Sequence, residues 1–600
     1  MPEEIADPLQ ESAWANQQTM NQKTALQTLT PGQQYELAQS VTHDYRQWKQ
    51  ARSVLEDRWR ECWEAYLCNV TTTYTQPDDY SADRSRVARP VLYEAVEAIH
   101  TNLLNGLFPG DEKFFTVMGK TEQDHANARL IEEFLKNKID DMGFFEKYAQ
   151  FLKQAIITGN TAAAIPWKRK TQKRRKTMPV TLLGIPVGTE KAVVETLVYN
   201  GPDFEVIDMF DFLLDPDQPE FAKAKLIRKV ERSLDYLKQC PFYSNIDQLQ
   251  AGWDDGSDNG NKLAKRTAFG ISEGALQDSS SRKDRVVLLE AWGDFRIGET
   301  LYENYVCVVA NDQTIIRFEE NPYDHGEKPF IFTTFIPVPN EVYGIGAIEK
   351  SLGLQHAINT LTNQKLDVIS ISINNPFTYL VNDDVFDPDT IVTRPGALIP
   401  VKSHETLQPI QYLNNYTVAF EEINDLKTEV QEATGALKYF TGGDTQNGND
   451  RTATEVNALV SGGNQKFSFF MSHLEHTSLE PFLQMSYENA RQFIDTPETL
   501  RILHPDGSAV FLDLPPEVLQ QSDCSFRVEG SRGLILEKQE ITAITAFLNA
   551  VKSDPVIRQQ INVLALYKKV YRRLGFTDEA DIFLDETAGK PAQPSDVQVG

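Results

Sequence analysis

The sequence predicts a mainly helical α+β protein built from several domains. A chain of 600 residues is too long to enclose a single hydrophobic core. Several long segments place apolar residues at steps of three and four, which is the pattern of amphipathic helices. Between about 284 and 340, shorter segments rich in Val, Leu, Tyr and Trp follow one another at the spacing of β-hairpins. Helices and strands of both kinds are therefore expected in one chain.

The first part of the chain is expected to be helical after a polar arm. Residues 1–29 are polar and Gln-rich, and we expect them to be disordered. Thr30 and Pro31 then open a long helix to about Tyr66, because Thr caps helices well and Pro fits the first turn. Arg52 belongs to the basic face of this helix, for which a solvated surface is the favoured interpretation. Further helices are expected at 90–107, 122–141 and 144–158.

A basic cluster follows these helices and differs from its acidic surroundings. Seven of nine consecutive residues are Lys or Arg: Lys168, Arg169, Lys170, Lys173, Arg174, Arg175 and Lys176. Alternating strands are expected next, at Val180 to Pro186 and Ala192 to Tyr199, with the turn at Gly188-Thr189. The cluster is either the exposed rim of this hairpin or a patch for phosphate or an acidic partner. Aromatic residues are not interleaved with it, so base stacking is not indicated.

Strands dominate the next stretch. A strand followed by a helix capped near Ser233 is expected in 222–240, and a surface loop in 251–283, where Gly, Asp, Ser and Asn accumulate. Strands are then expected at Arg285 to Phe295, Leu301 to Ala310 and Thr314 to Phe318.

A glycine pair precedes the next predicted helix. Gly344 and Gly346 form a lone Gly-x-Gly without a third glycine or a βαβ unit, so a turn is favoured over a nucleotide site. The helix itself is expected from about Ala347 to Ile373.

Two helices flanking a glycine-rich loop are the most distinctive stretch of the sequence. The first is expected over 416–434, with Asn415 as N-cap. The loop over 435–451 contains four glycines, which leave its backbone permissive. Thr452 and Glu455 then restart a helix as a capping box. Downstream, strands are expected at 500–510 and 524–528, and helices at 536–552 and 555–574.

Charge and cysteine usage exclude several classes of protein. Lys and Arg number 59 against 86 Asp and Glu, giving a net charge of −27. Such a surface would repel phosphates, which argues against a tight, sequence-specific DNA reader but permits a conduit along which DNA slides. The five cysteines are scattered and odd in number, which favours buried thiols in a reducing compartment over a disulfide framework. No targeting signal or membrane-spanning stretch is evident, so we expect a soluble chain with no membrane partner.

The sequence contains no recognisable catalytic motif. It has no nucleophile elbow, P-loop, paired-cysteine motif or His-Glu-x-x-His. No active site is therefore indicated, and we expect no catalytic residues, no metal site and no cofactor.

Three segments carry a resemblance to a known family. The loop over 435–451, the helix start Arg451-Thr452-Ala453-Thr454-Glu455-Val456 and the segment Tyr343-Gly344-Ile345-Gly346 resemble portal proteins, the head–tail connectors of short-tailed bacteriophages. The order of elements extends this resemblance over most of the chain. It implies a portal-like subunit with wing, stem, β-rich clip and helical C-terminal crown, assembling into a ring.

The implied domains follow the order of the elements. They are a disordered arm (1–29), the N-terminal part of the wing (30–223), the first stem helix region with a surface loop (224–283), the clip (284–340), the second stem helix (341–373), the C-terminal part of the wing (374–534) with a tunnel loop at about 435–451, the crown (535–576) and a flexible tail (577–600).

The resemblance also implies a function and partners. About twelve subunits would form a ring at the portal vertex of the virion, assembled in the host cytoplasm. Double-stranded DNA would pass through it during packaging and ejection. In that family the packaging ATPase is a separate protein, so the resemblance also implies that this chain is not an enzyme. The implied partners are the terminase large subunit, the major capsid protein and scaffold, and a tail adaptor protein.

Four residues of the loop are candidates for contact with the DNA. Lys438 and Arg451 at its edges would make transient phosphate contacts, while Tyr439 and Phe440 would narrow the passage. For all four, ordinary anchoring of the loop is the alternative. Two other functions stay open: another virion structural protein, such as a scaffold or internal core component, and a metal-dependent nucleic-acid enzyme with dispersed carboxylates.

Overall fold

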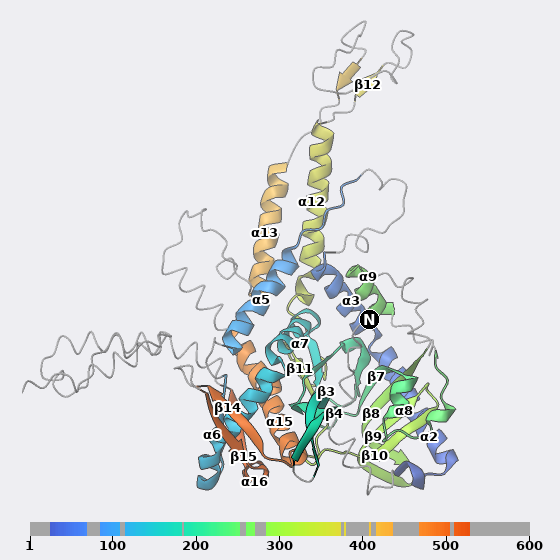
Figure 1. Cartoon of the computed structure of the whole chain (residues 1–600). Coiled ribbons are helices and arrows are strands. Elements are labelled where there is room, and N and C mark those ends of the chain that lie inside the picture. Colours follow the sequence, from blue (N-terminus) through green and yellow to red (C-terminus); the bar gives the residue numbers. More distant parts are fainter. Residues whose placement is uncertain are drawn as a thin grey trace, which may run out of the picture. The chain divides into compact units, whose positions relative to one another are not determined.

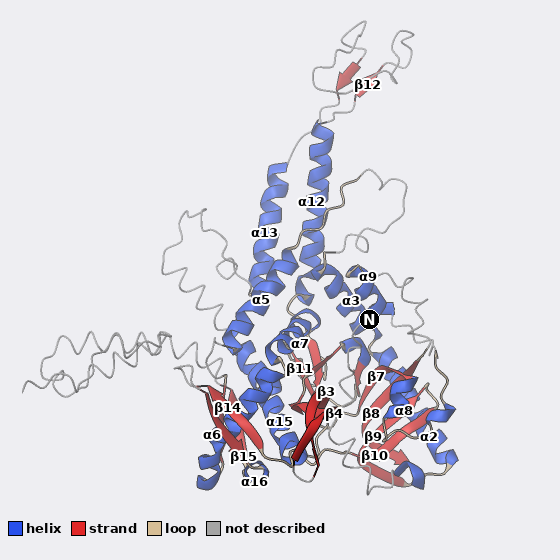
Figure 2. Ribbon diagram, viewed as in Figure 1, coloured by secondary structure: helices blue, strands red, loops and turns tan. Residues whose placement is uncertain are grey.

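The computed structural model describes residues 25–68, 84–108, 114–182, 185–252, 260–270, 284–373, 377–379, 407–409, 416–435, 467–503 and 509–528. The chain divides into two compact units. The larger unit comprises Met1–Leu103, Lys138–Phe470 and Met485–Phe493, and the smaller unit Leu104–Asn137, Met471–Gln484 and Ile494–Gly600. Both contain helices and strands, as the sequence predicted (Figures 1 and 2).

The expected N-terminal helix is interrupted once. It forms α2 (Pro31–Ala51) and α3 (Ser53–Tyr66), separated at Arg52. Thr30 caps α2 through a complete capping box with Gln33. The helices at α5 (Val91–Leu107), α6 (Glu122–Asp141) and α7 (Phe144–Thr158) agree closely with prediction.

Five antiparallel strands form one sheet of the larger unit, in the order β10-β9-β8-β7-β6. Their bounds are β6 (Phe212–Leu214), β7 (Leu226–Ser233), β8 (Arg285–Ile297), β9 (Thr300–Ala310) and β10 (Thr314–Glu320). The strands predicted between 285 and 318 are thus confirmed.

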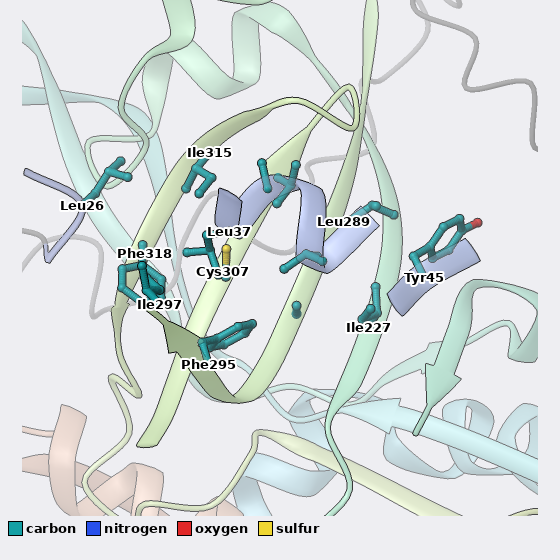
Figure 3. Packing of buried hydrophobic residues seen from close by; sticks show 14 of the residues in the cluster. Leu26, Leu37, Tyr45, Ile227, Leu289, Phe295, Ile297, Cys307, Ile315 and Phe318 are labelled. Atoms are coloured by element: carbon teal, nitrogen blue, oxygen red, sulfur yellow. The ribbon is translucent and has the colours of Figure 1, made fainter. Parts of the chain in front are cut away.

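Helix α2 and the short helix η3 (Ala25–Thr28) pack against this sheet. Leu37 of α2 and Leu26 of η3 share a buried cluster with Ile227, Leu289 and Cys307 of the strands (Figure 3). Burying this apolar surface is the main force that holds the helices on the sheet. The expected disorder is therefore wrong for Ala25 to Leu29, whereas residues 1–24 lie outside the described part of the chain.

Two expectations for this region need correction. The region 224–283, assigned to a first stem helix, begins with β7 and continues with the six-residue helix α8 (Leu234–Gln239), capped by Ser233 as predicted. The strands within 284–340 do not stand alone between two helices, because they extend the sheet begun by β6 and β7. Alternate residues of β8 and β9, such as Leu289 and Ala291 or Cys307 and Val309, form an apolar face of the sheet that α2 covers.

A second sheet of the larger unit has the order β11-β2-β5. Its strands are β2 (Asn160–Ala164), β5 (Glu205–Ile207) and β11 (Phe330–Thr334). Helix α7 leads directly into β2, and its Phe144, Tyr148 and Phe151 meet Phe204 at ring-centroid distances of 5.1, 6.2 and 5.3 Å.

The Gly344-Ile-Gly346 segment is a close crossing of two backbones. A β-carbon on Gly346 would lie 2.5 Å from the Ile157 carbonyl oxygen, and one on Gly159 only 2.4 Å from the Gly346 nitrogen. Asn160 is fully buried there, donates to the Gly344 carbonyl and accepts from its N–H. The segment is a turn before a helix, as predicted, and glycine is required because no side chain fits.

Two long helices of the larger unit lie side by side and antiparallel (Figure 1). They are α12 (Leu352–Ile373), which follows the turn η7 (Glu349–Ser351), and α13 (Tyr416–Thr434). Both were predicted from their apolar periodicity, and the bounds of α13 are those predicted. Between them the structure describes two short paired strands, β12 (Phe377–Tyr379) and β13 (Leu407–Pro409).

The described part of the smaller unit is built on two strand pairs. β1 (Phe115–Gly119) pairs with β16 (Cys524–Val528), and β14 (Glu498–Leu503) with β15 (Ala509–Leu514). α16 (Pro516–Gln521) joins the two pairs along the chain. Helix α15 (Glu480–Phe493) precedes β14 in the chain and follows a π-helical turn, η10 (Glu475–Leu479); its residues from Met485 onward belong to the larger unit. The helices expected at 536–552 and 555–574 and the tail lie outside the described residues.

Candidate functional site

The glycine-rich loop begins where α13 ends. Thr434 donates its hydroxyl hydrogen to the Val430 carbonyl at 2.7 Å, and Gly435 then takes a positive φ of 76°, which ends the helix. Lys438, Tyr439, Phe440 and Arg451 lie outside the described residues. Beyond the loop, described chain resumes in helical conformation at Phe467.

The basic cluster lies on a long β-hairpin of the larger unit. β3 (Trp167–Leu182) pairs with β4 (Ile185–Pro202). Trp167 anchors the base of the hairpin: it is fully buried, donates from Nε1 to Asn200 at 3.0 Å and stacks on Phe493. Lys168 is half-buried, 3.7 Å from Asp203. The side chains that follow are exposed, namely Arg169, Lys170, Lys173 and Arg174.

The hairpin extends further toward the N-terminus than predicted. The basic residues are themselves part of β3, and Arg175 and Lys176 pair through their backbones with Val193 and Ala192. Gly188 pairs with Val180 inside the ladder, so the predicted turn at Gly188-Thr189 is wrong, and the strands reverse between Leu182 and Ile185. Because neighbouring strand residues face opposite sides, the cations are distributed over both faces of the ribbon.

A second basic segment crosses the larger unit in extended form. We call residues 84–90 the strap. Its backbone is held by four α12 side chains placed four residues apart: Ser85 N–H bonds to Asp367 (2.7 Å), Val87 N–H to Asn363 (2.8 Å), Arg89 N–H to Asn359 (2.9 Å), and the following Leu92 N–H to Gln355 (3.2 Å). Asn363 and Gln355 also donate to the carbonyls of Val87 and Arg89.

The ladder works because two periods agree. Four residues of α-helix rise about 6.0 Å, and two residues of extended chain span about 6.6 Å. Alternate strap residues therefore meet successive side chains of one helix face. Arg84, Arg86 and Arg89 belong to the same segment, and their side chains are exposed.

Helix α13 has an acidic face. Glu421, Glu422, Asp425 and Glu429 are all exposed. Since each helical residue turns by about 100°, these four fall within an arc of about 100°. Ile423 and Val430, which are 4% and 0% exposed, lie roughly opposite that arc. We call the four carboxylates the acidic face of α13.

Ion pairs dock a further helix, α9 (Gly260–Ala268), on the same unit. Lys262 pairs with Asp211, and Lys265 with Asp208 at 2.9 Å. Burial disfavours ionisation of both carboxyls. At Asp208 the attraction of Lys265 outweighs burial and lowers the pKa, whereas at Asp211 burial prevails and raises the pKa. This site is structural, because each charge is matched by its docking partner.

One comparison with known proteins identifies the family. A family model described as the phage SU10 portal protein matches residues 183–599, which is more than half of the chain. The chain belongs to this family. It is therefore a phage portal protein, a virion component that connects head and tail. The matched residues include α12, α13 and the loop over 435–451, while the strap and β3 precede them.

The portal chain shows no arrangement of catalytic type in its described residues. No three His, Cys, Asp or Glu side chains of that part converge as metal ligands. All five cysteines are free thiols; Cys62, Cys240, Cys307 and Cys524 are buried as predicted, whereas Cys68 is only partly buried, and burial raises the pKa of Cys307 to about 12. None of the described helices is both long and apolar enough to cross a membrane.

Sequence reasoning missed two features of this portal protein. The acidic face of α13 was visible as carboxylates at four-residue steps within a predicted helix. The strap was not, because its partners on α12 are more than 260 residues away in the sequence.

Proposed function

We propose that the chain forms a ring of about twelve subunits at one capsid vertex and conducts double-stranded DNA during packaging and ejection. The family match is the observation that carries this proposal. A single chain cannot enclose duplex DNA with one pair of helices, so a channel needs several copies arranged about an axis. The ring would receive DNA from the terminase large subunit, sit within the major capsid protein, assemble with scaffold and bind a tail adaptor protein.

We further propose that α12 and α13 are the two stem helices. They are long, consecutive and antiparallel, and their intervening segment, 374–415, would then be the clip that meets the motor and the adaptor. This assignment replaces the earlier one, in which 224–283 and 284–340 served these roles. Those residues would instead belong to the wing, together with 30–223. We retain 535–576 as the crown.

The charge of the chain supports a sliding contact with DNA. At a net charge of −27, the protein as a whole repels phosphates, so only local cations can attract them. In our proposal Lys438 and Arg451 supply brief, sequence-independent contacts at the tunnel loop. Ring symmetry repeats each of them at one height, while Tyr439 and Phe440 narrow the opening.

The hairpin cations are proposed to act outside the channel. Arg169, Lys170, Lys173 and Arg174 are exposed on a ribbon whose faces both carry charge, which suits an acidic protein surface such as capsid or scaffold. Reversing Arg169 and Lys170 to Glu should lower incorporation into capsids while isolated rings still form. Normal incorporation would contradict this role.

Electron microscopy of the purified full-length chain tests the central proposal. We expect closed rings with a central opening, and mass photometry should give one dominant oligomer of about twelve copies. Virions assembled with the protein should then contain DNA. A chain that stays monomeric under all assembly conditions, or that forms assemblies without an opening, would overturn the proposal.

A further inference from the structure

We propose that neighbouring subunits of the ring are joined by the strap of one copy and the acidic face of α13 of the next. The partner is therefore a second copy of this chain. The inference rests on the proposed ring and adds the residues that make its stem interface.

The two charged surfaces lie on different flanks of the helix pair formed by α12 and α13. Lys365 lies on the side of α12 that meets α13, since its ammonium is 4.7 Å from the centroid of the Phe420 ring. The side chains that hold the strap lie about 140° away around the helix. One flank of the helix pair is thus basic, and the other, formed by the outward side of α13, is acidic.

Cyclic symmetry requires two such unlike flanks. In a head-to-tail ring each copy contributes two different surfaces, one to each neighbour. Arg84 and Arg89 form no ion pair with any described residue, and neither do Glu421, Glu422, Asp425 or Glu429. Complementary charges on the two flanks would favour the head-to-tail arrangement over others.

The heights of the two surfaces agree as well. Rotation about the ring axis leaves height unchanged, so contacting residues must lie at similar levels. Phe420 of α13 lies beside Lys365 of α12, so these two residues are at the same level along the helix pair. The helices are antiparallel, so Asn359, six residues before Lys365, lies beside residue 426 or so of α13. The strap, held from Asp367 to Asn359, therefore spans the levels of about 418 to 426, which include Glu421, Glu422 and Asp425.

Apolar residues on both surfaces fit the same pairing. Val87 in the strap is 41% exposed, and Val418, within the arc of the acidic face, is 64% exposed. Val87 is held by Asn363 and so lies beside residue 422 or so of α13, about four helical residues from Val418 along the helix pair. Contact between them would bury apolar surface between the charged pairs.

Charge reversal tests the interface directly. Two variants are made in the full-length chain: Arg84→Glu with Arg89→Glu, and Glu421→Lys with Asp425→Lys. Each is expected to raise the protein concentration at half-assembly by about tenfold or more, because like charges then face each other. The chain carrying all four substitutions should recover assembly, and so should an equimolar mixture of the two variants, in which copies alternate.

The controls separate this inference from the ring proposal. Lys223→Glu with Arg296→Glu reverses two exposed cations elsewhere in the larger unit and should assemble like wild type. Thermal melting and circular dichroism confirm folding of each monomer. If wild type forms no rings, the proposed function fails. If wild type forms rings and both reversed variants form them equally well, or the fourfold variant is not restored, the interface proposed here is wrong.

Discussion

Only glycine fits at position 346, because two backbone segments cross there and leave no room for a side chain. An added β-carbon would approach the Ile157 carbonyl oxygen to 2.5 Å. We expect Gly346→Ala to destabilise the larger unit by about 1–3 kcal/mol, as overpacking does in a rigid interior. Urea unfolding followed by tryptophan fluorescence measures this loss. Gly353→Ala is the matched control, since nothing lies within 4 Å of its β-carbon on α12, and it should be neutral or stabilising.

His325 gives the fold a pH dependence on the acid side. Burial lowers its pKa from 6.5 to about 4, its Nδ1 accepts from the Glu327 N–H at 2.9 Å, and its Nε2 is buried without a hydrogen-bond partner among the described residues. The pKa of His325 is lower in the folded state than in the unfolded state, so the contribution of this histidine to the free energy of unfolding is fully present above pH 6.5. It declines as the pH falls from 6.5 toward about 4, by up to about 3 kcal/mol.

His325→Asn isolates this effect. The asparagine oxygen can still accept from Glu327 but does not titrate. Melting temperatures at pH 7, 5.5 and 4.5 should therefore fall less steeply for this variant than for wild type. Parallel pH profiles for the two proteins would show that His325 does not contribute.

Arg52 shows why charge patterns at the residue scale mislead. Its place on a basic helix face favoured solvent exposure, yet it is only 4% exposed. It bonds to Glu56 at 2.8 Å and to Tyr343 at 3.2 Å, and it also donates to the Phe212 carbonyl. Two of these three partners, Tyr343 and Phe212, are more than 150 residues away in the sequence, so periodicity alone could not distinguish Arg52 from its solvated neighbours.

At the scale of elements, the side-chain ladder decides whether the strap stays on α12. Asn359→Leu with Asn363→Leu removes the acceptors of the Arg89 and Val87 N–H groups. These N–H groups are only partly buried, and each lost hydrogen bond costs about 0.5–1.5 kcal/mol, so we expect residues 84–90 to detach while α12 persists. Hydrogen–deuterium exchange should rise in the strap, and circular dichroism should change little.

Gln364→Leu provides the control for that experiment. Gln364 neighbours Asn363 but is exposed and holds no strap residue. Its exchange pattern should match wild type. Unchanged strap protection in the double variant would mean that other contacts hold the segment.

Helices and strands that depend on local sequence signals were predicted accurately, whereas those that depend on distant packing were not. α13 was predicted to its end residues because its apolar stripe, Ile423 to Val430, and the glycine at 435 are local signals. The β3–β4 turn was misplaced because glycines occur at both 184 and 188, and local turn signals do not choose between them. The register instead follows the anchored base at Trp167, which depends on distant packing.

At the scale of the whole molecule, the positions of helices and strands were easier to predict than the structural role of each region. Strands between 284 and 320 were found correctly, but sequence could not show that they join β6 and β7 in one sheet. The candidate stem pair becomes evident only when α12 and α13 are seen side by side. For the site, exposed cations of β3 were predictable from composition, whereas the strap required the fold.

The charge balance of the molecule leads to a prediction for the tunnel loop. Lys438→Glu replaces attraction by repulsion at one height of the proposed channel, and symmetry repeats the change in every subunit. DNA entering an already acidic passage would then meet a closed ring of carboxylates, so we expect packaged DNA per particle to fall by about tenfold or more. Ring formation should be unaffected, since the proposed interface lies at the stem. Quantification of nuclease-protected DNA in particles measures the loss, and Lys238→Glu, an equal charge change at an exposed residue of α8, should package normally. Full DNA content in the Lys438→Glu particles would exclude this lysine from the DNA path. Loss of DNA in both variants would instead point to an effect of net charge, because only the tunnel position differs between them.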